Sequence, residues 1–297
     1  MAMERRTRIW VGMGTWLLAG TSAIAMAGDA QAGSPQSGAS VQADRASHQL
    51  AQASSTHGHG AHGAAQGGEG GEGGEGGEAG ALAGAEPDQA FAAHLLLIRG
   101  HLMVGRELYD MKRPEDALPH YLHPAEEIYE ELKPALKQRR VSGFEQELKA
   151  LSEAVKAKRP ADEVAKLQER VAAKIDMAMN AIPAAMRAKP SFAAGATVLV
   201  LKVAAEEYDA AIENGRIANA VEYQDSRGFV AVSRAFLREH EQAMRAQDGQ
   251  AYDAVAKALA DLAKAYPTVV PPEKPAVSAG AFQAAASRVE LQAGNFK

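Results

Sequence analysis

Apolar residues recur at steps of three and four along most of residues 86–266, which is the spacing of one face of an α-helix. One such stripe consists of Phe91, Leu95, Ile98, Leu102 and Tyr109. No segment alternates apolar and polar residues with the period of two expected of a half-buried strand. Alanine is abundant and aromatic residues make up only 5%, which suits closely packed helices. The pattern therefore predicts an all-α protein, a helical bundle with no strands.

Helix start and stop signals divide this region into seven helices. Proline is favoured in the first turn of a helix, and three helices are predicted to open at Pro114, Pro160 and Pro190. Ser142 followed by Glu145 is a capping-box signature for the third helix. Asn214-Gly215 is a stop signal for the fifth helix. The last two helices are expected at about 216–245 and 249–266.

A short internal repeat suggests that the helical region contains two related halves. The matching segments are Phe91-Ala92-Ala93 with Phe192-Ala193-Ala194, Tyr109-Asp110 with Tyr208-Asp209, and His123 to Glu126 with Glu222 to Asp225. The repeat predicts two similar helical hairpins, packed as a pseudo-twofold four-helix bundle. Residues 140–189 would then form an intervening helical pair.

The first residues have the pattern of an export signal. Arg5, Arg6 and Arg8 precede a largely apolar stretch, which ends at the small-x-small site Ala25-Met26-Ala27. Residues 1–27 are therefore predicted to be a signal peptide, and the mature protein to be periplasmic or secreted, with no membrane span after processing. The absence of cysteine excludes a disulfide framework, thiol catalysis and a lipid anchor on cysteine.

Two further segments flank the predicted helical domain, residues 86–266. Residues 28–85 contain few large apolar side chains and repeat the triplet Gly-Gly-Glu, so they are predicted to form a disordered tether. This tether carries His57, His59 and His62, which form either a weak metal-binding arm or part of a plain spacer. Residues 267–297 hold four prolines and show weak periodicity, and a loosely packed tail is expected there.

Four histidines lie close together in the helical region, and imidazole is the commonest metal ligand in proteins. They are His94, His101, His120 and His123. His94 and His101 are two turns apart on one side of a helix, and His123 forms an H-x-x-E motif with Glu126, one turn away. A straight helix would point His123 away from the apolar stripe, whereas Pro124 could rotate it inward. The alternatives are hydrogen-bonded core histidines and a solvated face of a proline-kinked helix.

Carboxylates complete the predicted site. Glu206 shares a face with apolar residues, and Glu222 and Asp225 lie one turn apart. Because unpaired carboxylates are rarely buried, such positions suggest a partner ion. The predicted metal ligands are His94, His101, His120, His123, Glu126, Glu206, Glu222 and Asp225. Mixed nitrogen and oxygen ligands suit iron, zinc, manganese or copper(II).

The H-x-x-E motif in an exported, duplicated helical chain resembles the imelysin group, which includes EfeO-type periplasmic proteins of iron uptake. The family motif is G-x-H-x-x-E; His123 and Glu126 match it, and Tyr121 stands in place of the glycine. The resemblance implies a duplicated helical fold and a metal connection, with His123 and Glu126 as metal-site residues.

These observations predict an exported helical protein that binds a transition-metal ion (iron, zinc or copper) and takes part in its uptake, storage or delivery, with an envelope transporter as a candidate partner. The alternative is a helical interaction scaffold that binds no metal; a redox enzyme with a carboxylate-bridged metal pair is a third option. The chain has no Gly-x-Ser-x-Gly elbow, phosphate-binding loop or H-E-x-x-H helix, so an enzyme is not favoured. A net charge of -5 gives no sign of the basic surface that binds nucleic acid.

Overall fold

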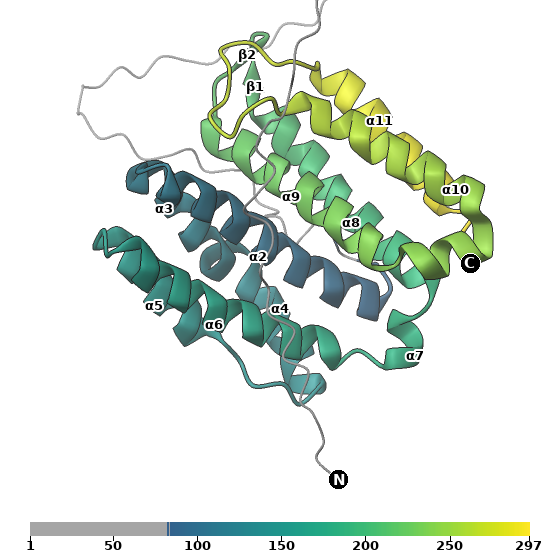
Figure 1. The fold of residues 1–297 in the computed structure, drawn as a ribbon, viewed down its shortest axis with the longest axis horizontal. Coiled ribbons are helices and arrows are strands. Elements are labelled where there is room, and N and C mark those ends of the chain that lie inside the picture. Colours follow the sequence, from purple (N-terminus) through teal and green to yellow (C-terminus); the bar gives the residue numbers. More distant parts are fainter. Residues whose placement is uncertain (1–81, 83) are drawn as a thin grey trace, which may run out of the picture. The chain divides into compact units, whose positions relative to one another are not determined.

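The computed structural model describes residues 82 and 84–297, which lie within one compact unit. The predicted signal peptide lies outside the described residues, and so does the predicted arm with His57, His59 and His62. The prediction of an all-α helical bundle is confirmed (Figure 1).

The N-terminal bundle is built from residues 87–180. Its elements are α2 (Pro87–Asp110), α3 (Pro114–His123), the π-helical turn η1 (Pro124–Ile128), α4 (Tyr129–Gln138), α5 (Glu145–Lys156) and α6 (Ala161–Asn180). The elements α3, η1 and α4 follow one another without a break. The helix α2 packs against α3, α3 against α5, α5 against α6, and α6 returns to α2.

The C-terminal bundle repeats this order. After α7 (Ala184–Arg187) come α8 (Pro190–Ala210), the strands β1 (Ile212–Glu213) and β2 (Arg216–Ile217), α9 (Ala220–Glu239), α10 (Glu241–Leu262), η2 (Ala263–Ala265) and α11 (Ala279–Ala293). The helices α8, α9, α10 and α11 close into a ring of neighbours in the same sequence as the first four. The helices α5 and α6 lie in the sequence between the two hairpins, as predicted, and they take the place in the N-terminal bundle that α10 and α11 take in the C-terminal bundle.

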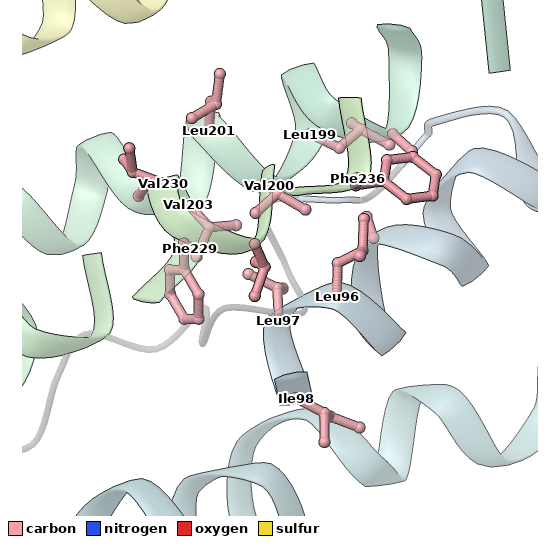
Figure 2. Close-up of a cluster of buried hydrophobic side chains, with 14 of the residues drawn as sticks. Leu96, Leu97, Ile98, Leu199, Val200, Leu201, Val203, Phe229, Val230 and Phe236 are labelled. Atoms are coloured by element: carbon pink, nitrogen blue, oxygen red, sulfur yellow. The ribbon is translucent and has the colours of Figure 1, made fainter. Parts of the chain in front are cut away.

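The two bundles share an interface along α2, which packs against both α8 and α9. Figure 2 shows Leu96 and Leu97 of α2 among Val200, Phe229 and Phe236, all of them buried. These apolar contacts supply the main driving force for joining the bundles.

Glycines bring α2 and α9 into backbone contact within this interface. A Cβ atom built on Gly228 would lie 2.5 Å from the carbonyl oxygen of Gly100. No larger residue fits at this crossing without moving the two helices apart.

Several local predictions are confirmed and others are wrong. Pro114 and Pro190 occupy the first turn of α3 and α8, as predicted. The capping box is wrong: α5 follows Phe144, which offers no side-chain cap and is buried, with its N–H donating to the Tyr129 hydroxyl. Asn214-Gly215 forms the turn of a small antiparallel hairpin, with φ of 52° and 74° at the two residues. This turn geometry favours Asn-Gly, and the expectation of no strands missed it.

The last helix corrects the expectation of a loose tail after residue 266. Ser278 caps α11 by accepting the N–H of Ala281, and Phe282 and Val289 are buried. Phe282 stacks on Tyr208 of α8, with ring centroids 4.4 Å apart. The weak periodicity of this alanine-rich segment hid a helix that completes the C-terminal bundle.

Candidate metal centre

Three buried side chains meet where α2, α3 and α9 come together. The Oδ1 atom of Asp225 accepts hydrogen bonds from Nδ1 of His101 and from Nδ1 of His120, each at 2.7 Å. All three side chains are fully buried. In the described part of the chain, this is the one group of three or more His, Asp or Glu residues with ligand atoms mutually within 4.8 Å.

The close approach of α2 and α9 positions this cluster. His101 directly follows Gly100, and Asp225 lies one turn before Gly228, so the glycine contact brings both side chains together. The ring of His101 also packs edge-on against Phe229, at 5.0 Å between centroids. Its orientation is therefore fixed on two sides.

A π turn adds a third histidine. Pro124 has no N–H to continue the α-helical ladder, and the N–H of Tyr129 bonds to the carbonyl oxygen five residues back, at Pro124. His123, at the start of this turn, points inward with its Nδ1 3.2 Å from Oδ2 of Asp225. Its side chain is 18% exposed. The inward rotation that Pro124 allowed therefore takes place.

The same turn separates the H-x-x-E pair. Glu126 is exposed and forms no ion pair with His123 in the described chain. Instead, Oε1 of Glu127 lies 3.7 Å from Nε2 of His123. The π turn holds more residues per turn than an α-helix, so it rotates Glu126, three residues after His123, away from the ring. Glu127, four residues after His123, lies above the ring instead.

Gln224 orients His120 from the side opposite Asp225. Nε2 of His120 lies 2.9 Å from Oε1 of Gln224, and the amide nitrogen of Gln224 donates to the carbonyl oxygen of Val269 at 3.2 Å. That second bond fixes which end of the amide faces the ring. Both ring nitrogens of His120 therefore lie within hydrogen-bonding distance of an oxygen acceptor.

Charge balance in the cluster depends on the histidines. Burial alone would raise the pKa of Asp225, but the charges and hydrogen bonds of His101 and His120 hold this pKa well below its usual range. Burial alone would lower the pKa of His123, but Asp225 has the opposite and larger effect, so the pKa of His123 is raised. Asp225 thus stays ionised at full burial.

Within the cluster, two buried polar atoms have no hydrogen-bond partner in the described part of the chain, Oδ2 of Asp225 and Nδ1 of His123. They lie 3.2 Å apart, but their geometry is not that of a hydrogen bond. A cation beside both would satisfy them, and a carboxylate with imidazoles is a ligand set that zinc and ferrous iron accept. Ligands about 2.1 Å from a tetrahedral ion lie about 3.4 Å apart, so the 2.7 Å pairs would need to open by less than about 1 Å. The residues therefore fit a metal ion.

The other predicted ligands lie outside the cluster. His94 is buried on α2, two turns before His101, and burial lowers its pKa to about 4. Among the residues that the structure describes, its Nε2 has no hydrogen-bond partner. Glu206 is exposed on α8, so the prediction that it points into the core is wrong. Glu222 accepts a hydrogen bond from the Asn219 amide at the start of α9.

Fold and cluster together define a double helical bundle with a buried histidine–aspartate centre between its halves. Residues 183–295 match the model of a family described as the iron permease-associated 4-helix bundle domain. This segment covers the C-terminal bundle with Gln224 and Asp225, but none of the histidines of the cluster.

No curated protein and no solved structure matches the chain. The match makes residues 183–295 similar to this family, and the resemblance to the imelysin group is not confirmed.

None of the helices in the described part of the chain has both the length and the apolar character that a bilayer span requires.

Proposed function

We propose that this protein is exported and binds a divalent transition-metal ion reversibly at His101, His120, His123 and Asp225. One observation carries the proposal: a fully buried carboxylate lies among three imidazoles, and its second oxygen has no hydrogen-bond partner. Leaving a buried acceptor unsatisfied costs about 1–3 kcal/mol, and more for a charged group. A bound cation removes this cost.

Iron is the favoured metal, and uptake, storage or delivery outside the cytoplasm is the favoured role. The description of the matching family supports iron as the metal and uptake as the role, because it names an association with an iron permease. An envelope transporter is accordingly the proposed partner. Ferrous iron accepts mixed nitrogen and oxygen ligands, as do zinc and copper(II).

Binding and release follow from the hydrogen bonds of the cluster. An ion at Nδ1 of His101 and His120 takes the place of the protons that these atoms now donate to Asp225. Gln224 keeps its bond to the far nitrogen of His120 and holds the ring in the binding orientation. Since metal binding releases protons, acidification favours release of the ion.

The test compares two carboxylates of α9. Asp225→Asn keeps the shape of the side chain and removes its charge, whereas Glu222→Gln does the same one turn away, outside the cluster. We expect Asp225→Asn to lower the affinity for anaerobic Fe²⁺ and for Zn²⁺ at least about tenfold, and Glu222→Gln to leave it unchanged. Affinity is measured by calorimetry, with bound metal counted by mass spectrometry. Equal affinity of both variants and the wild type would refute the assignment.

A second form of the protein, without residues 28–85, separates the centre from the predicted arm. If this form binds metal fully, the binding site lies in the helical domain. If this form does not bind metal, the binding site is assigned to His57, His59 and His62. No metal in either form would favour the interaction scaffold, in which metal leaves the melting temperature unchanged.

A further inference from the structure

The centre is nearly closed to solvent. The side chains of His101, His120 and Asp225 have no exposed surface, and among the four residues of the cluster only His123 reaches the surface. Of these four side chains, His123 is therefore the one that can meet an ion at the surface.

The two nitrogens of His123 face two different carboxylates. Nδ1 points inward and lies 3.2 Å from Oδ2 of Asp225, whereas Nε2 points outward and lies 3.7 Å from Oε1 of Glu127. The Glu127 side chain is 37% exposed. The outer distance is too long for a hydrogen bond. It exceeds by about 0.3 Å the separation of about 3.4 Å between two ligands of one tetrahedral ion.

We propose that Nε2 of His123 and the carboxylate of Glu127 form an outer binding step, which a divalent transition-metal ion occupies on its way to Asp225. This inference rests on the proposed function of the inner centre. The outer step offers one imidazole and one carboxylate, with water as the remaining ligands, and it is therefore weak. The inner centre offers a carboxylate and three imidazoles, so the ion moves inward by exchange of ligands.

The exchange needs only side-chain motion. The ion gives up Glu127 and its outer waters, and it gains Oδ2 of Asp225 as the ring of His123 turns about its Cβ–Cγ bond. The protons on Nδ1 of His101 and His120, which the ion displaces, leave to solvent. No electron is transferred, and the oxidation state of the ion does not change. Because the Glu127 side chain is partly exposed, its carboxylate can move inward with the ion during the first part of this exchange.

The chain supplies a closely matched control in Glu126. This residue is exposed, carries the same charge and neighbours Glu127, but the π turn keeps it away from His123. A general attraction of cations to this acidic surface would act through both glutamates alike and would weaken at high salt. A binding step acts through Glu127 alone.

The experiment measures Zn²⁺ uptake and release by stopped flow with a zinc-sensitive dye, on the full mature chain and its Glu127→Gln and Glu126→Gln variants. A residue that contacts the ion only on its path changes the barrier and not the end states. We therefore expect Glu127→Gln to slow both uptake and release about fivefold, with the equilibrium Kd changed less than about twofold. Glu126→Gln leaves both rates within about 1.5-fold of the wild type.

Three results would overturn the proposal. Equal rates for the two variants would reduce Glu127 to a surface charge. A Kd raised tenfold or more by Glu127→Gln would make Glu127 a permanent ligand of the centre. Absence of Zn²⁺ binding in the wild type would reject the inner centre and the outer step with it, and this result appears before any variant is measured.

Discussion

Replacing Gly228 by alanine tests whether the contact between α2 and α9 holds the centre together. The added Cβ would lie 2.5 Å from the carbonyl oxygen of Gly100, 2.9 Å from its carbonyl carbon and 3.0 Å from Cγ2 of Val104. Ordinary contacts of a Cβ atom begin near 3.4 Å. Two of the three neighbours are backbone atoms, which cannot rotate away, so the helices must separate by about 0.9 Å.

Two effects of opposite sign determine the change in stability. Overpacking of a core costs about 1–3 kcal/mol, and a rigid backbone neighbour places this site near the upper limit. Alanine is preferred to glycine within a helix by about 1 kcal/mol. We expect a net loss of about 2 kcal/mol in the free energy of unfolding. The same separation stretches the 2.7 Å bond between His101 and Asp225, so the affinity for metal also falls.

The assay is urea unfolding of the metal-free protein, combined with Zn²⁺ calorimetry, on Gly228→Ala and Gly280→Ala. Gly280 also lies in a helix, but nothing lies within 4 Å of the Cβ it would gain. Gly280→Ala should keep or raise the stability, by up to about 1 kcal/mol, and leave the affinity for Zn²⁺ unchanged. A Gly228→Ala variant as stable as the wild type, with the same affinity for Zn²⁺, would refute the role of the glycine contact.

Two further predictions concern residues outside the centre. Burial lowers the pKa of His94 to about 4, so as the pH falls from about 7 the unfolded chain binds this proton first, and stability decreases towards pH 4. His94→Leu should make the stability of the metal-free protein depend less on pH between 7 and 5 in urea unfolding; an unchanged dependence would contradict the neutral, buried His94. Gly215 has a φ of 74°, and Gly215→Ala should destabilise the protein by about 1–2 kcal/mol, although its Cβ meets no neighbour. A urea midpoint equal to that of the wild type would show that the hairpin adjusts without strain.

Most of the helices could be predicted because their signals are local. Apolar periodicity and the prolines at the start of α3 and α8 act within one or two turns of the chain. Asn214-Gly215 was read correctly as an interruption, but a helix stop and a hairpin turn use the same residues. Which of the two forms depends on the segment that follows. The N–H of Ile217 in β2 bonds to the carbonyl oxygen of Glu273, a contact between distant segments that no local pattern contains.

The composition of the centre could be predicted only in part. Four of the eight proposed ligands come together, namely His101, His120, His123 and Asp225. The H-x-x-E motif pointed to Glu126, although an α-helix brings residues three and four positions away equally near, and the π turn after Pro124 leaves Glu127 beside His123. Gln224 was not proposed at all, since its role depends on a bond to Val269, forty-five residues further along the chain. The signal that sequence offered was a polar pair, Gln224-Asp225, on the face of α9 that carries Gly228.

The centre draws its residues from both bundles, and this division bears on the metal it selects. The segment that matches the iron permease-associated bundle contributes Asp225 and its neighbour Gln224, whereas the histidines come from α2 and from the end of α3. A carboxylate alone prefers hard cations such as Mg²⁺ and Ca²⁺, and added imidazoles move the preference to iron, zinc and copper. In the proposed metal site, the N-terminal bundle would therefore provide the selectivity, and the glycine contact between α2 and α9 joins it to the carboxylate. Under that proposal, a change on either side of the contact would alter which metal binds, even where the matching family segment is intact.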